Sequence, residues 1–162
     1  MMKKVEIGDD KMVYLFTGLN SDGDTGNNRV AMNSFEDVVK FSIWPELTLD
    51  GMRERVSSSL RITKHFTLLN PENNLHPIKQ IERVRQLSEI QKEFPDVTFI
   101  VTTVSNYIIE AFELYFKDSI KFYIVEEGKA EEVAVTEVDI LYKPFAHAIQ
   151  KLEELRYMSN EY

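Results

Sequence analysis

The stretch FTLLNPENNLHPIKQ, residues 66–80, decides how the chain is interpreted. An apolar run ends at Asn70, and a Pro-Glu-Asn-Asn sequence then leads to His76. Buried strands of α/β sheets are short apolar runs, and such sheets bind ligands beyond the carboxyl ends of their strands. The stretch therefore predicts a central buried strand, followed by a polar turn at the end of the sheet where ligands bind.

The hydrophobic pattern on both sides of this stretch alternates between strands and helices. In the helix after the central strand, Ile78, Ile81, Val84 and Leu87 should face the core. Trp44 precedes a proline in a loop, and we expect it to fill a gap in the core. Further strands are predicted at residues 4–7, 12–17, 97–103, 120–125 and 130–138, and helices at residues 28–41, 52–64, 77–94, 106–116 and 141–157.

Length and charge narrow the class of protein. The 162 residues suit one domain, residues 1–162, with its own core. The net charge of −8 argues against a general attraction to nucleic acid or to anionic membranes. Residues 51–100 carry a net charge of +2, whereas residues 101–162 carry −6. The chain has no cysteine, no signal-peptide pattern and no apolar run of membrane-spanning length, so we expect a cytoplasmic protein without thiolate metal sites.

The loop after the strand at 12–17 reads GLNSDGDT, residues 18–25. Gly18, Gly23 and Thr25 have the spacing of the phosphate-binding loop G-x-x-x-x-G-K-[ST], but Asp24 occupies the lysine position. An anion in place of a cation removes one attraction to phosphate and adds one repulsion, each about 4 kcal/mol at ~4 Å and an effective dielectric near 20. The alternative is a surface turn rich in Gly, Asp and Asn. A calcium loop would need a further glycine and a distant glutamate, which are missing.

Together these segments resemble the ABC-type ATPase heads of the AAA group that are related to overcoming-lysogenisation proteins. In that family a strand ends in Asp-Glu-Pro-Glu and the chain continues to Leu-His-Pro. Thr17 to Thr25, with Asn20, resembles the family's loop Thr-Gly-Leu-Asn-x-x-Gly-Lys-Thr, and residues 102–105 resemble its Thr-Thr-His-Ser segment. The residues of the central stretch that keep the family pattern are Pro71, Glu72, Leu75, His76, Pro77 and Gln80.

The resemblance implies that four functional groups of the family have been replaced. Asp24 stands for the loop lysine, Leu69 and Asn70 for the Asp-Glu pair that handles magnesium and water, and Val104 for the histidine that senses the terminal phosphate. Valine has no donor for a phosphate oxygen. Glu72 alone, without a lysine or a metal ligand, lacks the rest of a catalytic site. The degenerate nucleotide-binding positions are thus Gly18, Asn20, Gly23, Asp24, Thr25, Asn70, Glu72 and Val104.

The segment TLDGMR, residues 48–53, resembles the family signature Leu-Ser-x-Gly-Glu-Arg, which contacts the nucleotide of an opposing subunit. Gly51 and Arg53 match it; the alternative is a helix cap at Thr48 or Asp50. The segment follows the phosphate loop too closely for a full head, so a middle insert is missing. Since heads of this family work in face-to-face pairs, the resemblance gives as interface candidates Gly51, Arg53, Asn74 and His76.

We therefore expect a shortened, three-layer α/β domain of the P-loop NTPase type, with a mostly parallel sheet. The resemblance implies a pseudo-ATPase without catalytic residues, metal or cofactor, which pairs with itself or regulates an active ABC-type ATPase, in phage defence or counter-defence. The competing interpretation is an ATP-binding or ATP-hydrolysing protein that uses ATP and Mg²⁺ with Thr25 and Glu72. A third is a structural domain of a larger complex. His65 and His147 have no partner at metal-ligand spacing.

Overall fold

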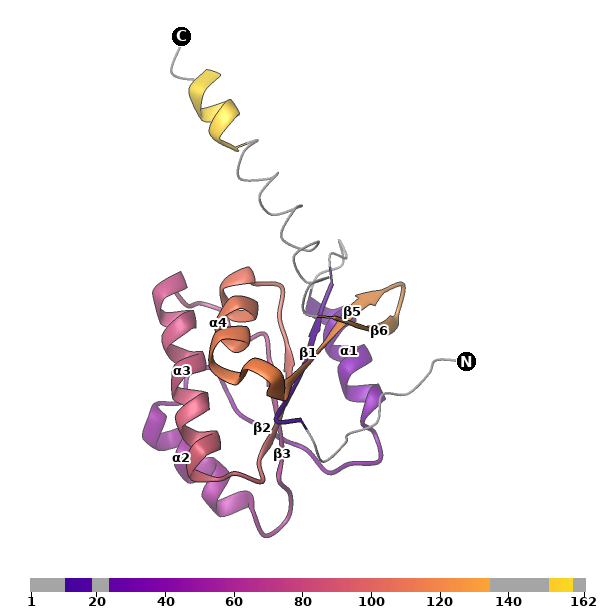
Figure 1. The fold of residues 1–162 in the computed structure, drawn as a ribbon, viewed down its shortest axis with the longest axis vertical. Coiled ribbons are helices and arrows are strands. Elements are labelled where there is room, and N and C mark those ends of the chain that lie inside the picture. Colours follow the sequence, from indigo (N-terminus) through magenta and orange to yellow (C-terminus); the bar gives the residue numbers. More distant parts are fainter. Residues whose placement is uncertain (1–10, 19–23, 135–151, 159–162) are drawn as a thin grey trace. The chain divides into compact units, whose positions relative to one another are not determined.

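The computed structural model contains a central six-stranded sheet with the strand order β2-β3-β4-β1-β5-β6 (Figure 1). The structure describes residues 11–18, 24–134 and 152–158. Strands β1 to β5 pair in parallel, and β6 follows β5 through a two-residue hairpin turn at Glu127 and Gly128, both with positive φ. The strands are β1 (Val13–Thr17), β2 (Phe41–Ser42), β3 (His65–Leu69), β4 (Thr98–Thr102), β5 (Ile120–Glu126) and β6 (Lys129–Val133).

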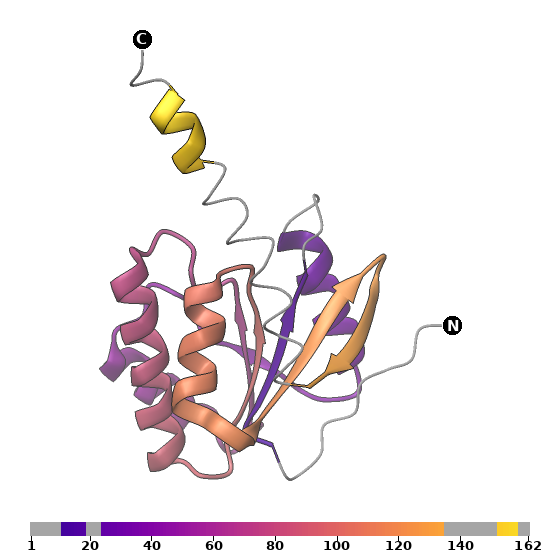
Figure 2. The same ribbon diagram turned by 45° about the horizontal axis from the view of Figure 1, so that its top comes forward.

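Helices cover both faces of this sheet (Figures 1 and 2). On one face α1 packs against a cluster that includes Phe16, Phe35 and Tyr123. On the other face lie α2, α3 and α4, with Phe116 of α4 edge-on to Phe99 of β4. The helices are α1 (Asp24–Ser34), α2 (Leu49–Ser59), α3 (Pro77–Glu93) and α4 (Asn106–Phe116), and a 3-10 turn, η1, spans Lys117–Ser119. The predicted α/β fold with a mostly parallel sheet is confirmed.

The connections define a switch point between the neighbouring strands β1 and β4. The chain leaves β1 through α1 on one face of the sheet, and it leaves β4 through α4 on the opposite face. The helices that follow these two strands therefore lie on opposite faces of the sheet (Figure 1). In open α/β sheets, ligands bind beyond the carboxyl ends of the strands at such a point. Gly18, which follows β1, and the segment after Thr102 lie at this point.

Several predicted elements differ from those observed. The helix predicted at 28–41 spans Asp24–Ser34 instead, and Phe41 belongs to β2. The helix predicted at 52–64 is α2, which starts at Leu49 because the Thr48 hydroxyl accepts a hydrogen bond from the N–H of Gly51. The predictions of a buried Trp44 and of a core-facing Ile78 are wrong, since these side chains are 59% and 68% exposed.

The predictions for residues 4–7, for Asn20 and Gly23, and for most of the helix at 141–157 lie outside the described residues. Residues 152–158 are helical and belong to a second compact unit, residues 133–162. Among the helices that the structure describes, none has the length and hydropathy needed to cross a membrane.

Candidate functional site

The carboxyl ends of β1, β4 and β3 lie side by side, because β4 pairs with both of the others. Gly18 directly follows β1, residues 103–105 follow β4, and Asn70 follows β3. The sheet therefore brings three of the segments that carry the family resemblance to one edge. The side chains of Asp24 and Thr25, at the start of α1, lie outside what the structure describes.

Glu72 ties the turn after β3 to the segment after β4. Its two carboxylate oxygens lie 2.9 and 2.8 Å from the Thr103 hydroxyl, which donates to them, and the N–H of Val104 donates over 3.1 Å. The N–H of Ser105 in turn donates to the Thr103 hydroxyl over 3.0 Å. The carboxylate thus accepts from two donors of this segment, the Thr103 hydroxyl and the Val104 N–H.

Asn70 adopts an unusual backbone conformation at the end of β3, with φ of 54° and a side chain that is only 4% exposed. Its N–H donates to the carbonyl of Thr102 over 2.9 Å. The Thr102 hydroxyl donates to Oδ1 of Asn28 in α1. Within the described part of the chain, Oδ1 of Asn70 has no hydrogen-bond partner. An asparagine tolerates positive φ better than most residues, which explains how this turn forms.

Asn27 is a second buried amide at this edge. It is fully buried in α1, and its Oδ1 lies against Gly18. Neither Nδ2 nor Oδ1 of Asn27 has a hydrogen-bond partner among the described residues. Buried polar groups in proteins are nearly always paired, so two orphaned amides at one sheet edge are unusual. Departures of this kind from ordinary protein structure cluster at functional or strained sites.

We expect Asn27→Leu to raise the free energy of unfolding by about 1 kcal/mol, because leucine removes two unpaired buried polar atoms at similar volume. Asn28→Leu is the matched control at the next position. It should lower the stability by about 1 kcal/mol, since Asn28 accepts the hydrogen bond of Thr102. Urea titrations of both variants measure the difference. A loss of stability in Asn27→Leu would show that the amide is paired in solution.

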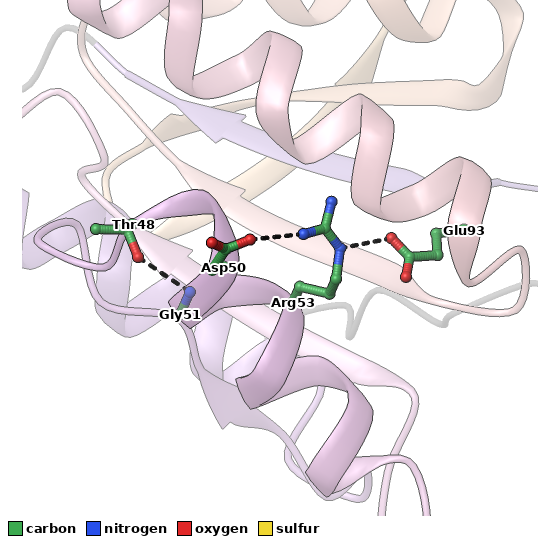
Figure 3. A network of polar contacts seen from close by, with 5 residues as sticks. All are labelled: Thr48, Asp50, Gly51, Arg53 and Glu93. Carbon is green, nitrogen blue, oxygen red and sulfur yellow. Dashed lines mark hydrogen bonds and ion pairs between the residues drawn. The ribbon is translucent and has the colours of Figure 1, made fainter.

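The interface candidates lie in two different places. Figure 3 shows Arg53 between Asp50, at 2.8 Å, and Glu93, at 2.7 Å, and the hydrogen bond with Glu93 raises the pKa of Arg53. Arg53 thus contacts the C-terminal end of α3. His76 caps the opposite end, where its Nδ1 accepts the N–H of Ile78 over 3.3 Å. The two ends of α3 are about 24 Å apart, so Arg53 and His76 do not form one patch.

Gly51 and Asn74 line two grooves on either side of the loop at residues 44–47. Gly51 belongs to a groove between this loop and α2, and Asn74 to a groove that also includes Pro45 and Leu75. Asn74 has a φ of 63°, so its turn, like that at Asn70, depends on positive φ. The structure thus places Gly51 with Arg53 on the first turns of α2, and Asn74 with His76 in the turn before α3.

Sequence reasoning missed Asn27 and Asn28 as members of this edge, and it named Thr102 only as part of the family-like segment at residues 102–105. The signal was available in part, since Thr102 ends a predicted strand and the asparagines follow the loop at 18–25. Among the described residues, no three His, Asp or Glu side chains are grouped as a metal site. No family model matches this sequence, and comparison with curated proteins finds no similar one. The fold defines an open α/β domain with a polar carboxyl edge.

Proposed function

We propose that this protein is a catalytically inactive ATPase-like domain that acts through protein–protein contacts, by pairing with itself or with an active ABC-type ATPase. The observation that supports the proposal is that β1, β4 and β3, which lead into three of the family-like segments, lie side by side in the sheet. At this edge the carboxylate of Glu72, which keeps the family pattern, accepts hydrogen bonds from Thr103 and Val104. The loss of nucleotide binding is inferred from the residues that depart from the pattern.

The residues that depart from the family pattern near this edge also disfavour nucleotide binding. Asp24 adds a negative charge at the start of α1, and Leu69 and Asn70 provide no carboxylate for magnesium. Phosphoryl transfer needs cations and a metal at the terminal phosphates. The missing lysine and the missing metal ligands therefore both remove stabilisation of the same phosphates. One strand, β4, separates the strand before the loop from the strand before Asn70. This arrangement is compatible with an ABC-type head and supports the resemblance at the level of the fold.

We expect no increase in melting temperature when ATP and Mg²⁺ are added up to millimolar concentrations. A ligand at ten times its Kd would add about 1.4 kcal/mol, or a shift of roughly 3–6 °C for a chain of this size. An Asp24→Lys variant, measured in parallel, tests the loop charge directly and should gain nucleotide-dependent stabilisation. A clear increase in the melting temperature of the natural sequence would contradict the proposal that the protein is inactive. It would favour an ATP-binding or ATP-hydrolysing protein that uses Thr25 and Glu72.

Purification of the tagged chain from its native cell tests the partner. A full-length ABC-type ATPase should be recovered with it. We propose that the two proteins act together in the cytoplasm, in phage defence or counter-defence. Recovery of a larger assembly that contains no ATPase would support the structural-domain interpretation instead.

A further inference from the structure

Two buried amides at the carboxyl edge of the sheet have unused hydrogen-bonding capacity. Neither Nδ2 nor Oδ1 of Asn27 has a partner among the described residues, and Oδ1 of Asn70 has none either. Asn27 is fully buried in α1, and Asn70 is 4% exposed at the end of β3. Unpaired polar atoms in the interior destabilise a fold, and a ligand that pairs with them on binding offsets this cost. The two amides therefore mark a candidate binding site.

The two amides belong to one continuous part of this edge. Oδ1 of Asn27 lies 2.9 Å from the position that a Cβ of Gly18 would take, at the end of β1. Asn28, the next residue of α1, accepts the hydrogen bond of the Thr102 hydroxyl at the end of β4. The oxygen of that hydroxyl lies 3.3 Å from the backbone nitrogen of Asn70. Neighbouring strands are about 4.8 Å apart, so roughly 10 Å separate the ends of β1 and β3, the span of a small planar molecule with a hydrogen bond at each end.

The chemistry of the unpaired atoms limits the kind of ligand. An amide with both atoms unpaired is complementary to a planar edge that carries a donor beside an acceptor, as asparagine is to a nucleobase. A cation would leave Nδ2 of Asn27 unpaired, and an anion would meet the carboxylate of Glu72. Two donors that an anion would need, the Thr103 hydroxyl and the Val104 N–H, already donate to that carboxylate. The edge therefore fits an uncharged ligand.

We propose that the carboxyl edge of β1, β4 and β3 binds a small, uncharged, planar molecule that carries a donor beside an acceptor, the pattern shared by primary carboxamides and nucleobases. Asn27 pairs with this edge of the ligand, and Oδ1 of Asn70 accepts from a second donor. Because both side chains are buried, the edge has to open for the ligand to enter, and binding selects the open state. The inference goes beyond the proposed function, since it requires neither a partner protein nor a phosphate.

Two matched pairs of small molecules test the ligand class by thermal shift of the full chain. Nicotinamide and uracil both carry the expected edge, and at least one should raise the melting temperature, by roughly 3–6 °C at ten times its Kd. The larger effect of the two distinguishes a carboxamide ligand from a nucleobase. Nicotinate, an anion of nearly the same shape as nicotinamide, and uracil methylated on both nitrogens, which has no N–H donor, should not stabilise the chain. No stabilisation by nicotinamide or uracil up to about 10 mM, or equal stabilisation by the two control molecules, would overturn the inference. Neither result bears on the proposed function, which only stabilisation by ATP and Mg²⁺ would contradict.

Variants at the two amides test where the ligand binds. Asn27→Leu should be more stable than the natural chain without ligand, yet in calorimetric titrations it should bind the effective probe at least about tenfold more weakly. Asn33→Leu makes the same change at an exposed position of α1 and should bind as the natural chain does. Asn70→Gly suits the positive φ of the turn and removes Oδ1, so it should also weaken binding. Lys117→Gly, at a φ of 47° before β5 and thus at the opposite edge of the sheet, is its control. Undiminished binding by both asparagine variants at the edge would refute the site.

Discussion

Replacing Gly18 with alanine is expected to lower the free energy of unfolding by about 3 kcal/mol. A Cβ built on Gly18 would lie 2.4 Å from the carbonyl oxygen of Val125 and 2.9 Å from Oδ1 of Asn27. Val125 belongs to β5, which pairs with β1 next to Gly18, so that carbonyl cannot withdraw without disturbing the sheet. Urea denaturation followed by circular dichroism measures the loss.

Gly128→Ala is the control for this substitution. Gly128 has a φ of 76° in the hairpin turn, and nothing lies within 4 Å of the position of its Cβ. Alanine there tests backbone strain alone and should reduce stability by about 1 kcal/mol. If Gly18→Ala were no more harmful than Gly128→Ala, the close approach of β5 to the loop would be refuted. The glycine at the start of the phosphate-loop-like segment thus has a packing role that is independent of any nucleotide.

Arg83→Met is expected to cost about 2–3 kcal/mol. Burial lowers the pKa of the Arg83 guanidinium, which donates to the carbonyls of Pro45 and Leu47 and lies 3.2 Å from the sulfur of Met52. Methionine keeps much of the apolar packing but leaves both carbonyls without this charged donor. The variant should also loosen the loop, which time-resolved anisotropy of Trp44 would detect as faster local motion.

Arg85→Met, two residues further along α3, provides the comparison. Arg85 pairs with Glu82 and Glu89 on the exposed side of the helix, and exposed pairs contribute little. We expect this variant to leave both the stability and the anisotropy of Trp44 nearly unchanged. Equal effects of the two arginine variants would mean that Arg83 does not fix the loop.

The strands of the sheet were predictable because buried strands are dense in apolar and β-branched residues. The strand predicted at 97–103 is β4, Thr98–Thr102, and the helix predicted at 106–116 is α4 with the same bounds. The start of α1 was not predictable from periodicity, because its first residues, Asp24 to Asn27, show no apolar repeat. A strand of two residues, β2, is likewise too short to give a pattern, and Phe41 was therefore assigned to a helix.

The exposed positions of α3 were missed for a different reason. Ile78, Ile81, Val84 and Leu87 recur at every third residue, and each step of three rotates about 60° around a helix. The buried face of α3 runs through Gln80, Val84, Leu87 and Gln91, so Ile78 and Ile81 are turned away from it and are 68% and 39% exposed. At the site, the sequence indicated the segments that meet at the carboxyl edge. It did not indicate the contact of Glu72 with Thr103, because a contact over 31 positions depends on the pairing of β3 with β4.

The two borders of the sheet also affect how the protein behaves at high concentration. β2 offers only Phe41 and Ser42 for pairing, and β6 places Lys129, Glu131 and Glu132 at exposed positions of its five residues. Short or charged border strands discourage strand addition and hence fibril growth. Concentrated solutions of this chain should therefore stay clear, and any assembly that forms in them should dissociate again on dilution.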